Sequence, residues 1–360
     1  MTAGILTGRP LIATTAMLGV VAYGALATLH VVLRQLAGDH FSWLYVLNML
    51  AVVLWAPALP ALLLLLLGRF WWPAVALCVL PAVMWATTFG PYLVPGRDSP
   101  GQAATAPGTS APGTSAPGTS APGTSAPGTS APGTSLRVIF WNVKPRDPSV
   151  DLAALVAEST PDIVMMAELP GDFEDEVVAA VPSLPYHYFA PAVQAEVACC
   201  GETAVLSRYP IVDARTIEGL PAQARTAAVV TLDVDGTRMD VVPLHLASPL
   251  AGRGVRDLGR QARLREDETA VIADALRDHD VPLLVGGDLN SSMANTPRRL
   301  LRDAGLEDLQ LESGSGLGTT RRKLRIDWLF ASGLRTGRAW TGNARDSDHR
   351  PVLADVVLPR

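Results

Sequence analysis

The sequence predicts a C-terminal α/β layered domain preceded by an all-α transmembrane anchor of three helices. Two observations support this prediction: apolar residues are concentrated before residue 96, and short β-rich runs alternate with helical patterns after residue 135. Hydrophobic residues form 49% of the 360-residue chain, charged residues form only 18%, and the mean hydropathy is +0.25. This composition excludes a chain that is soluble throughout its length.

Charged residues divide the chain into two parts. Residues 1–135 carry four basic and two acidic side chains, whereas residues 136–360 carry 25 basic and 32 acidic ones. The resulting net charge of −7 in the second part gives no bulk attraction for nucleic acid or anionic headgroups. Three cysteines, of which Cys199 and Cys200 are adjacent, are too few for a disulfide framework.

The anchor is expected at residues 1–98. It contains three apolar runs, at residues 11–33, 42–67 and 70–95. Each run is long enough for a membrane-spanning helix, which needs about 20 residues, and the first is too long for the apolar part of a cleaved signal peptide. Alternatively, two runs form a hairpin and the third is interfacial or re-entrant, because Pro73, Pro81 and Pro91 interrupt it.

Loop charges leave the orientation of the anchor nearly undecided. With the N-terminus inside, Arg9 and Arg69 are cytoplasmic, while Arg34 and Arg97 are outside. A Thr/Ser/Pro-rich linker is commoner outside cells, so we expect a multi-pass protein of the bacterial cell membrane whose C-terminal domain is extracytoplasmic.

A disordered linker is expected at residues 99–135. It includes six perfect copies of Ala-Pro-Gly-Thr-Ser at residues 106–135, which offer no side chain for a core. As a flexible coil the repeats span about 30 Å, and as extended polyproline roughly 90 Å. The repeats therefore act as a spacer, or are a repeat expansion without further function.

The C-terminal domain is expected at residues 136–360. Its first strand is followed by a helical pattern, residues 233–236 form a hairpin turn, and Thr296-Pro297 is typical of a helix start. Strands are expected at residues 136–141, 162–167, 203–206, 226–233, 238–246, 281–285, 326–330 and 352–357, and helices at 149–158, 254–277 and 296–304.

Most of these strands end in polar residues. The residues are Asn142, Glu168, His245, Asp288 with Asn290, Asp327, and Asp348 with His349. Each alone has an ordinary explanation as a turn former, a helix cap or a buried histidine. Together they predict a metal and phosphate site, since Mg²⁺ prefers carboxylate and amide oxygens and an attacking water needs a base. Cysteine and histidine spacings typical of a zinc site are not present.

These motifs resemble the endonuclease/exonuclease/phosphatase superfamily of metal-dependent phosphoesterases over residues 136–358, and they occur in that superfamily's order. The motifs are Phe140-Trp141-Asn142, Met166-Ala167-Glu168, residues 201–210, Pro243-Leu244-His245, Gly287-Asp288-Leu289-Asn290, Arg325-Ile326-Asp327-Trp328 and Ser347-Asp348-His349-Arg350-Pro351. The resemblance implies a four-layer α/β sandwich of the DNase I-like type. It also implies a Mg²⁺ cofactor, or alternatively Mn²⁺, with Glu168 as main ligand assisted by Asn142 and Asp348.

Roles in catalysis follow from the same resemblance. Asp288 would align or deprotonate the attacking water, while Asn290 and His245 would hold non-bridging phosphate oxygens. His349, oriented by Asp327, would act either as general base or as a hydrogen-bond donor to the transition state. The chain departs from many members at Ala167 and Leu244, but neither change removes a functional group.

The substrate must be inferred from the rest of the chain. A metal-dependent endonuclease is disfavoured by the negative domain charge and the anchor. A basic cluster of Arg321, Arg322, Lys323 and Arg325 precedes Asp327, and we expect its arginines to bind a second phosphate, unless the cluster is a solvated loop.

The layout resembles a membrane-anchored bacterial branch associated with teicoplanin-type glycopeptide resistance. That resemblance implies hydrolysis of a lipid-linked phosphate, such as a polyprenyl (undecaprenyl) pyrophosphate. The alternatives are a sphingomyelinase-like phospholipid phosphodiesterase, the endonuclease, and a non-catalytic lipid or cell-wall sensor. Membrane lipid is the expected partner, nucleic acid is not, and no feature indicates an obligate protein partner.

Overall fold

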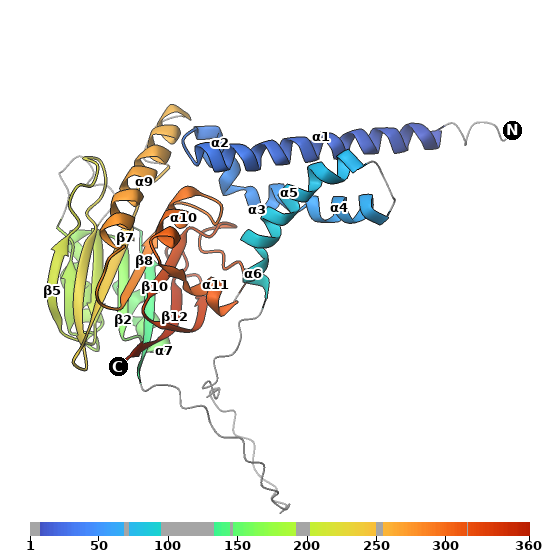
Figure 1. Cartoon of the computed structure of the whole chain (residues 1–360). Coiled ribbons are helices and arrows are strands. Elements are labelled where there is room, and N and C mark those ends of the chain that lie inside the picture. Colours follow the sequence, from blue (N-terminus) through green and yellow to red (C-terminus); the bar gives the residue numbers. More distant parts are fainter. Residues whose placement is uncertain are drawn as a thin grey trace, which may run out of the picture.

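The computed structural model describes residues 8–67, 72–94, 133–144, 147–191, 202–249, 255–314 and 316–360. Predictions about Cys199, Cys200 and nearly all of the linker lie outside these residues. Within the described residues, a two-sheet domain carries an arm of apolar helices that projects from one side (Figure 1).

Two six-stranded sheets form the domain. The first has the order β11 (Arg335–Thr341), β12 (Val352–Pro359), β1 (Gly133–Asn142), β2 (Ile163–Leu169), β4 (Glu202–Ser207), β3 (Tyr186–Phe189). The second has the order β5 (Ile211–Thr216), β6 (Ala228–Val234), β7 (Thr237–His245), β8 (Leu283–Asp288), β10 (Asp327–Ser332), β9 (Glu307–Asp308).

Buried side chains assemble the two sheets and their helices into four layers. Phe140 and Met165 of the first sheet pack with Val241 of the second in the central core. The outer face of the first sheet is covered by α7 (Ser149–Ser159) and α8 (Glu174–Ala180), and that of the second by α9 (Val255–Ala275) and α10 (Thr296–Asp303). This arrangement agrees with the predicted DNase I-like sandwich.

The expected strands and helices of the domain are all present, with ends shifted by a few residues. The hairpin turn joins β6 to β7, where Asp235 and Gly236 adopt positive φ. Strand β1 begins at Gly133, so the last three residues of the repeats pair with β12 and belong to the sheet. Strands β3, β5, β9 and β11 were not expected from the sequence.

The prediction of three uninterrupted transmembrane helices is wrong. In the described residues, α1 (Gly8–Ala37) is the one continuous helix that is long and apolar enough to span a membrane. The second run is broken into α2 (Ser42–Met49), α3 (Ala51–Trp55) and α4 (Ala58–Leu67), with a bend of 69° after α2. The third gives α5 (Trp72–Thr88), which is shorter, and α6 (Gly90–Leu93).

Local chemistry explains two of these breaks. Pro57 lies between α3 and α4, and Pro91 is the second residue of α6; proline has no backbone N–H to bond to the preceding turn. The bend after α2 follows Asn48, whose side chain donates to Gly38 O and Asp39 and whose carbonyl accepts from Ser292 of the domain.

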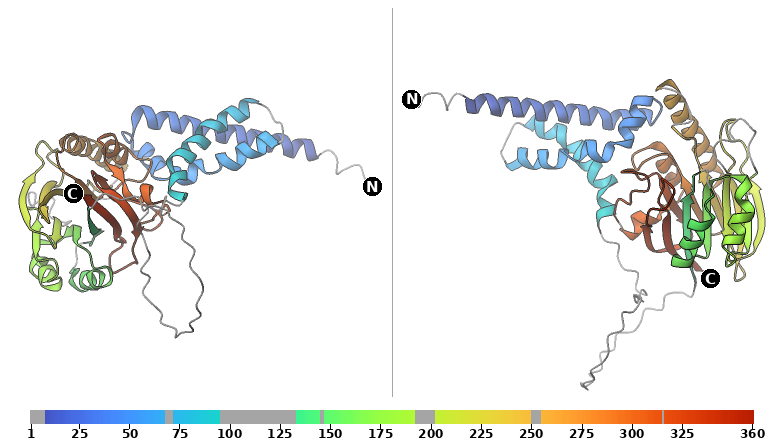
Figure 2. Two further views of the ribbon diagram at one scale, coloured as in Figure 1. Left: turned by 60° about the horizontal axis from the view of Figure 1, so that its bottom comes forward. Right: turned by 180° about the vertical axis from the view of Figure 1, so that it is seen from behind.

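The anchor and the domain share a hydrophobic core. Trp55, Phe89 and Tyr92 of the anchor are buried in the same cluster as Trp328 and Leu301 of the domain. The two further views show the end of the helical arm against the second sheet and its helices (Figure 2). The arm is therefore docked on the domain.

Candidate active site

Strand register brings the predicted site residues together from both sheets. In the first sheet, Asn142 at the end of β1 is level with Ala167, next to Glu168. In the second, Asp288 at the end of β8 pairs with His245 of β7 on one side and with Asp327 of β10 on the other. The site lies where the ends of these central strands meet.

Two glycines permit this close packing. A Cβ on Gly286 would lie 2.5 Å from Met165 Cε of the other sheet, and one on Gly287 would lie 2.6 Å from Leu244 Cβ. Both distances are shorter than side chains tolerate, so the Gly-Gly pair before Asp288 has a packing role.

A bulge in β2 directs Glu168 toward the site. The register of β2 with β4 shifts between Met166 and Leu169, and Glu168 has a φ of 60°. Left-handed backbone is uncommon for a residue with a side chain, and bulges are frequent next to active sites because they re-aim a side chain.

An amide joins the two carboxylates of the site. Asn142 Nδ2 donates to Glu168 Oε1 and to Asp288 Oδ2, each at 3.0 Å. Its Oδ1 accepts from the backbone of Lys144 at 3.0 Å. Rotation of the amide by 180° would exchange Nδ2 and Oδ1. Asn142 can therefore present either a hydrogen-bond donor or a metal-ligand oxygen to the space between Glu168 and Asp288.

The carboxyl of Asp288 is fully enclosed and can accept a proton near neutral pH. Burial raises the pKa of Asp288 to about 7; the Asp327 carboxylate adds to the rise, and His349 opposes it. Its Oδ1 also accepts from Asn290 N at 2.8 Å, which fixes its orientation.

His349 and Asp327 form a buried pair. His349 Nδ1 lies 2.9 Å from both carboxylate oxygens of Asp327, and its Nε2 lies 3.8 Å from Asp288 Oδ2. Burial lowers the pKa of His349, but the carboxylates of Asp327 and Asp288 outweigh it and raise the pKa to about 9. The imidazole therefore carries both protons at neutral pH, with Nε2–H directed at the site.

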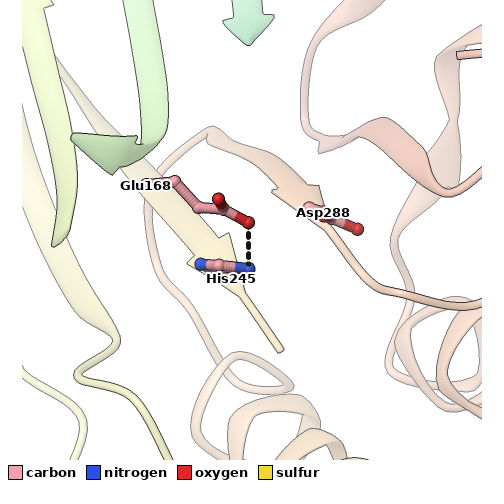
Figure 3. A group of neighbouring side chains, drawn as sticks. All are labelled: Glu168, His245 and Asp288. Carbon is pink, nitrogen blue, oxygen red and sulfur yellow. Dashed lines mark ion pairs between the residues drawn. The ribbon is translucent and has the colours of Figure 1, made fainter. Parts of the chain in front are cut away.

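His245 is neutral and has unused hydrogen-bonding capacity. Burial, Arg225 and His349 lower its pKa well below 6.5. Its Nε2 lies 3.3 Å from Glu168 Oε1, the contact drawn in Figure 3, and neither ring nitrogen makes a hydrogen bond within the described residues. Buried polar atoms without partners are costly unless a ligand satisfies them.

The donor set fits a divalent cation. Glu168, His245 and Asp288 each present one ligand atom within 4.8 Å of the others (Figure 3), and Asp288, Asp327 and His349 form a second such group. Because His349 is protonated, the first group with the Asn142 amide is the better candidate. Its oxygens are the ligands that Mg²⁺ and Mn²⁺ prefer.

Asp348, the third predicted ligand, lies apart from this group. Its Oδ2 accepts from Arg321 Nε at 3.0 Å and Nη2 at 2.8 Å, and its Oδ1 lies 3.6 Å from Lys144 Nζ. These cations lower its pKa although burial raises it. In this arrangement Asp348 holds Arg321 beside the site, where Arg321 also interacts with Glu168 and Asp288.

The three arginines of the basic cluster occupy different positions in the structure. Arg321 lies at the site as expected, and Arg322 is exposed in a tight turn with a φ of 52°. The expectation of phosphate binding by Arg325 is corrected: its side chain is 1% exposed, pairs with Asp308 at 3.0 Å and stacks on Trp328. The paired carboxylate keeps Arg325 in the core.

Several supporting residues were not expected from the sequence. Ser347 Oγ donates to Asn142 O at 2.7 Å and accepts from His349 N at 3.1 Å, which ties the His349 loop to β1. Thr320 Oγ1 accepts from Asp327 N at 3.1 Å. From the anchor, Tyr45 Oη donates to Asn290 O at 3.0 Å. The sequence gives no signal for these contacts between distant residues.

Two facing sheets with carboxylates, an amide and two histidines at their central strand ends define a DNase I-like sandwich with a phosphoesterase-type site. The family described as Endonuclease/Exonuclease/phosphatase matches residues 139–349, more than half of the chain, and the chain belongs to this family. Members of this family are hydrolytic phosphoesterases that are typically metal-dependent.

One of two similar solved structures supports the fold assignment. The catalytic domain of human Nocturnin is 18% identical, with a TM-score of 0.50, 62% of this chain covered and 93% of that one. The Beutenbergia cavernae family member is 19% identical, with a TM-score of 0.48 and coverage of 62% and 72%. Nocturnin at this identity shows the shared fold alone. No curated protein matches the chain.

Proposed function

We propose that this protein is a membrane-anchored, Mg²⁺-dependent phosphoesterase that hydrolyses a lipid-linked phosphate or pyrophosphate at the membrane surface. A polyprenyl pyrophosphate such as undecaprenyl pyrophosphate is the substrate we favour, with a link to glycopeptide resistance as its biological context. The observation that supports it most directly is the contact between the anchor and the site, where Tyr45 touches the backbone of Asn290.

Side-chain exposure supports the membrane location. Leu18 and Leu26 of α1 and Leu63 and Leu64 of α4 are each more than half exposed. Soluble proteins rarely leave large apolar patches in water, whereas lipid solvates them. We propose that the helical arm lies in the bacterial membrane as a multi-pass anchor, with the catalytic domain on the extracytoplasmic side.

The chemistry we propose follows from the protonation states at the site. Asp288 takes a proton from the attacking water, whose oxygen bonds to phosphorus while the bond from phosphorus to the leaving oxygen breaks and the leaving group departs with its electron pair. Nε2–H of His349 donates a hydrogen bond to an oxygen of the reacting phosphate. Asn290 and neutral His245 hydrogen-bond non-bridging oxygens, and Arg321 binds the outer phosphate of a pyrophosphate. Of the candidate ligands, Glu168 and Asn142 would hold Mg²⁺, because Asp288 and His245 act on the water and the phosphate; the ion supplies charge neutralisation of the phosphate when bound.

Substrate comparison tests the proposal. Detergent-solubilised full-length protein is incubated with Mg²⁺ and undecaprenyl pyrophosphate, sphingomyelin or plasmid DNA, and product formation is measured. Release of inorganic phosphate from the pyrophosphate, absent in His349→Ala, is the expected result. Cleavage of sphingomyelin or DNA instead would replace the lipid pyrophosphate by the corresponding alternative.

A further inference from the structure

Among the segments of the domain that the anchor contacts is the loop of residues 289–295, which connects β8 to α10 and carries Asn290. Arg34 Nε donates to Ala294 O at 2.6 Å, and Ser292 Oγ donates to Asn48 O at 3.1 Å. Tyr45, only 3% exposed, donates to Asn290 O. The loop between two catalytic-domain elements is thus held from outside the domain.

Asp39 is the centre of this interface. It is 1% exposed, and its Oδ1 accepts from Asn48 Nδ2 at 2.7 Å and from Asn295 Nδ2 at 2.8 Å. Its Oδ2 accepts from Thr296 N at 3.0 Å, the first residue of α10. A buried carboxylate that is fully hydrogen-bonded fixes the groups around it, because moving any of them would leave it unpaired.

Asn290 needs such support. Its backbone has a φ of 47°, a conformation that L-residues adopt at a cost, so the surrounding contacts must over-determine it. One N–H of its amide is used by Leu246 O at 3.0 Å, and the other is available to a phosphate oxygen. The Tyr45 hydroxyl satisfies the carbonyl of this same residue.

We propose that residues 38–49, which comprise the corner after α1 and the whole of α2, are a positioning element of the active site. This element holds the 289–295 loop so that the Asn290 amide meets the substrate phosphate, and Tyr45 is the positioning residue that acts directly on Asn290. The inference rests on the proposed phosphoesterase activity of the site. It predicts that membrane anchoring and turnover are coupled through protein contacts, whichever phosphoester is the substrate.

A single-hydroxyl deletion tests this inference. Tyr45→Phe in the full-length protein keeps the ring and removes only the donor to Asn290. Tyr23→Phe is the matched control, because the Tyr23 hydroxyl donates to Leu54 O within the anchor at 2.9 Å. With a soluble chromogenic phosphodiester as probe, we expect Tyr45→Phe to lower kcat about tenfold with little change in KM, since small misplacements of binding groups act on turnover. Tyr23→Phe should match the wild type.

A double-mutant cycle separates positioning from general destabilisation. If Tyr45 acts through Asn290, Tyr45→Phe should cause no further loss in an Asn290→Ala background. An equal loss in both backgrounds, or a wild-type kcat in Tyr45→Phe, would overturn the inference.

Hydrogen exchange provides a readout that needs no substrate. The backbone amides of residues 289–295 should exchange faster in Tyr45→Phe than in the wild type and in Tyr23→Phe. Unchanged protection of the loop overturns the inference. A wild-type protein that turns over no phosphoester, but whose loop loses protection in Tyr45→Phe, would instead refute the proposed function and retain the positioning contact.

Discussion

Replacement of Asp327 by asparagine tests whether His349 works as a protonated donor. The substitution keeps the shape of the side chain but removes the charge whose two oxygens lie 2.9 Å from His349 Nδ1. That charge, with Asp288, overcomes the effect of burial and raises the pKa of His349 to about 9. Without it, burial is opposed by Asp288 alone, and the pKa of His349 should fall toward its ordinary value of 6.5.

The magnitude follows from this change. A fall in the His349 pKa from about 9 to 6.5 corresponds to about 3.4 kcal/mol of lost stabilisation of the imidazolium, or a factor of about 300 in its protonation equilibrium. With a pKa of 6.5, only about a quarter of the His349 imidazole is protonated at about pH 7, so Asp327→Asn should lower kcat/KM at neutral pH about fourfold through loss of the donor form. Its activity should also disappear at a lower pH than in the wild type.

The assay is the pH dependence of kcat/KM for the wild type and Asp327→Asn with saturating Mg²⁺. A donor loses activity as the pH rises through its pKa, so wild-type activity should fall near pH 9 and that of the variant near neutrality. Asp355→Asn is the control, because Asp355 pairs with Arg137 in the middle of β1, away from Asn142. Wild-type rates that rise through pH 9, or a variant as active as the control, would refute the donor role.

Three further predictions concern the metal and the core. Glu168→Gln should abolish Mg²⁺-dependent turnover and weaken Mg²⁺ binding in calorimetry while leaving the circular dichroism unchanged; unaltered Mg²⁺ affinity would contradict its role as ligand. Burial raises the pKa of Glu268 from 4.5 to about 7, so the folded protein favours the protonated carboxyl. The free energy of unfolding of the wild type should therefore fall as the pH rises from 4.5 through 7. Glu268→Gln should avoid this loss, gaining at most about 3 kcal/mol over the wild type in denaturant titrations above that range; a difference independent of pH would contradict this. Asp308→Ala leaves the buried cations of Arg298 and Arg325 unpaired and should cost about 3–5 kcal/mol in thermal unfolding, whereas an unchanged melting temperature would show that the pairing is not needed.

The core strands of the domain were predictable because a buried strand consists of consecutive apolar residues, which can be recognised in the local sequence. Strands β2 and β8 and the second half of β1 are apolar on both faces, and their sheets are covered by helices. Each therefore appears in the sequence as an apolar run that stops at Asn142, Glu168 or Asp288. The site was predictable for the same reason, since the polar residues follow directly after those runs.

Long-range pairing determined what the sequence did not reveal. Strand β11 contains Arg335, Gly337 and Arg338, a composition that predicts a loop, and it forms because β12 offers it a partner. Arg325 was assigned to the substrate because it adjoins Arg321, but Asp308, 17 residues earlier, pairs with it in the core. Arg321 and Arg325 were predicted to share a role because they are close in the sequence, but the fold places Arg321 at the site and Arg325 in the core.

The clearest case of long-range contacts that the sequence does not reveal is the boundary between the anchor and the domain. Composition separates the two parts, yet Tyr92 of α6 donates to the buried Asp308, and Trp55 and Phe89 share a core with Trp328. A domain expressed from residue 133 onward would expose that core face and would also lose Asp39 and Tyr45. The apolar half of the chain therefore completes the core beside the active site, and activity measured without it would describe a site whose Asn290 loop has lost its outer contacts.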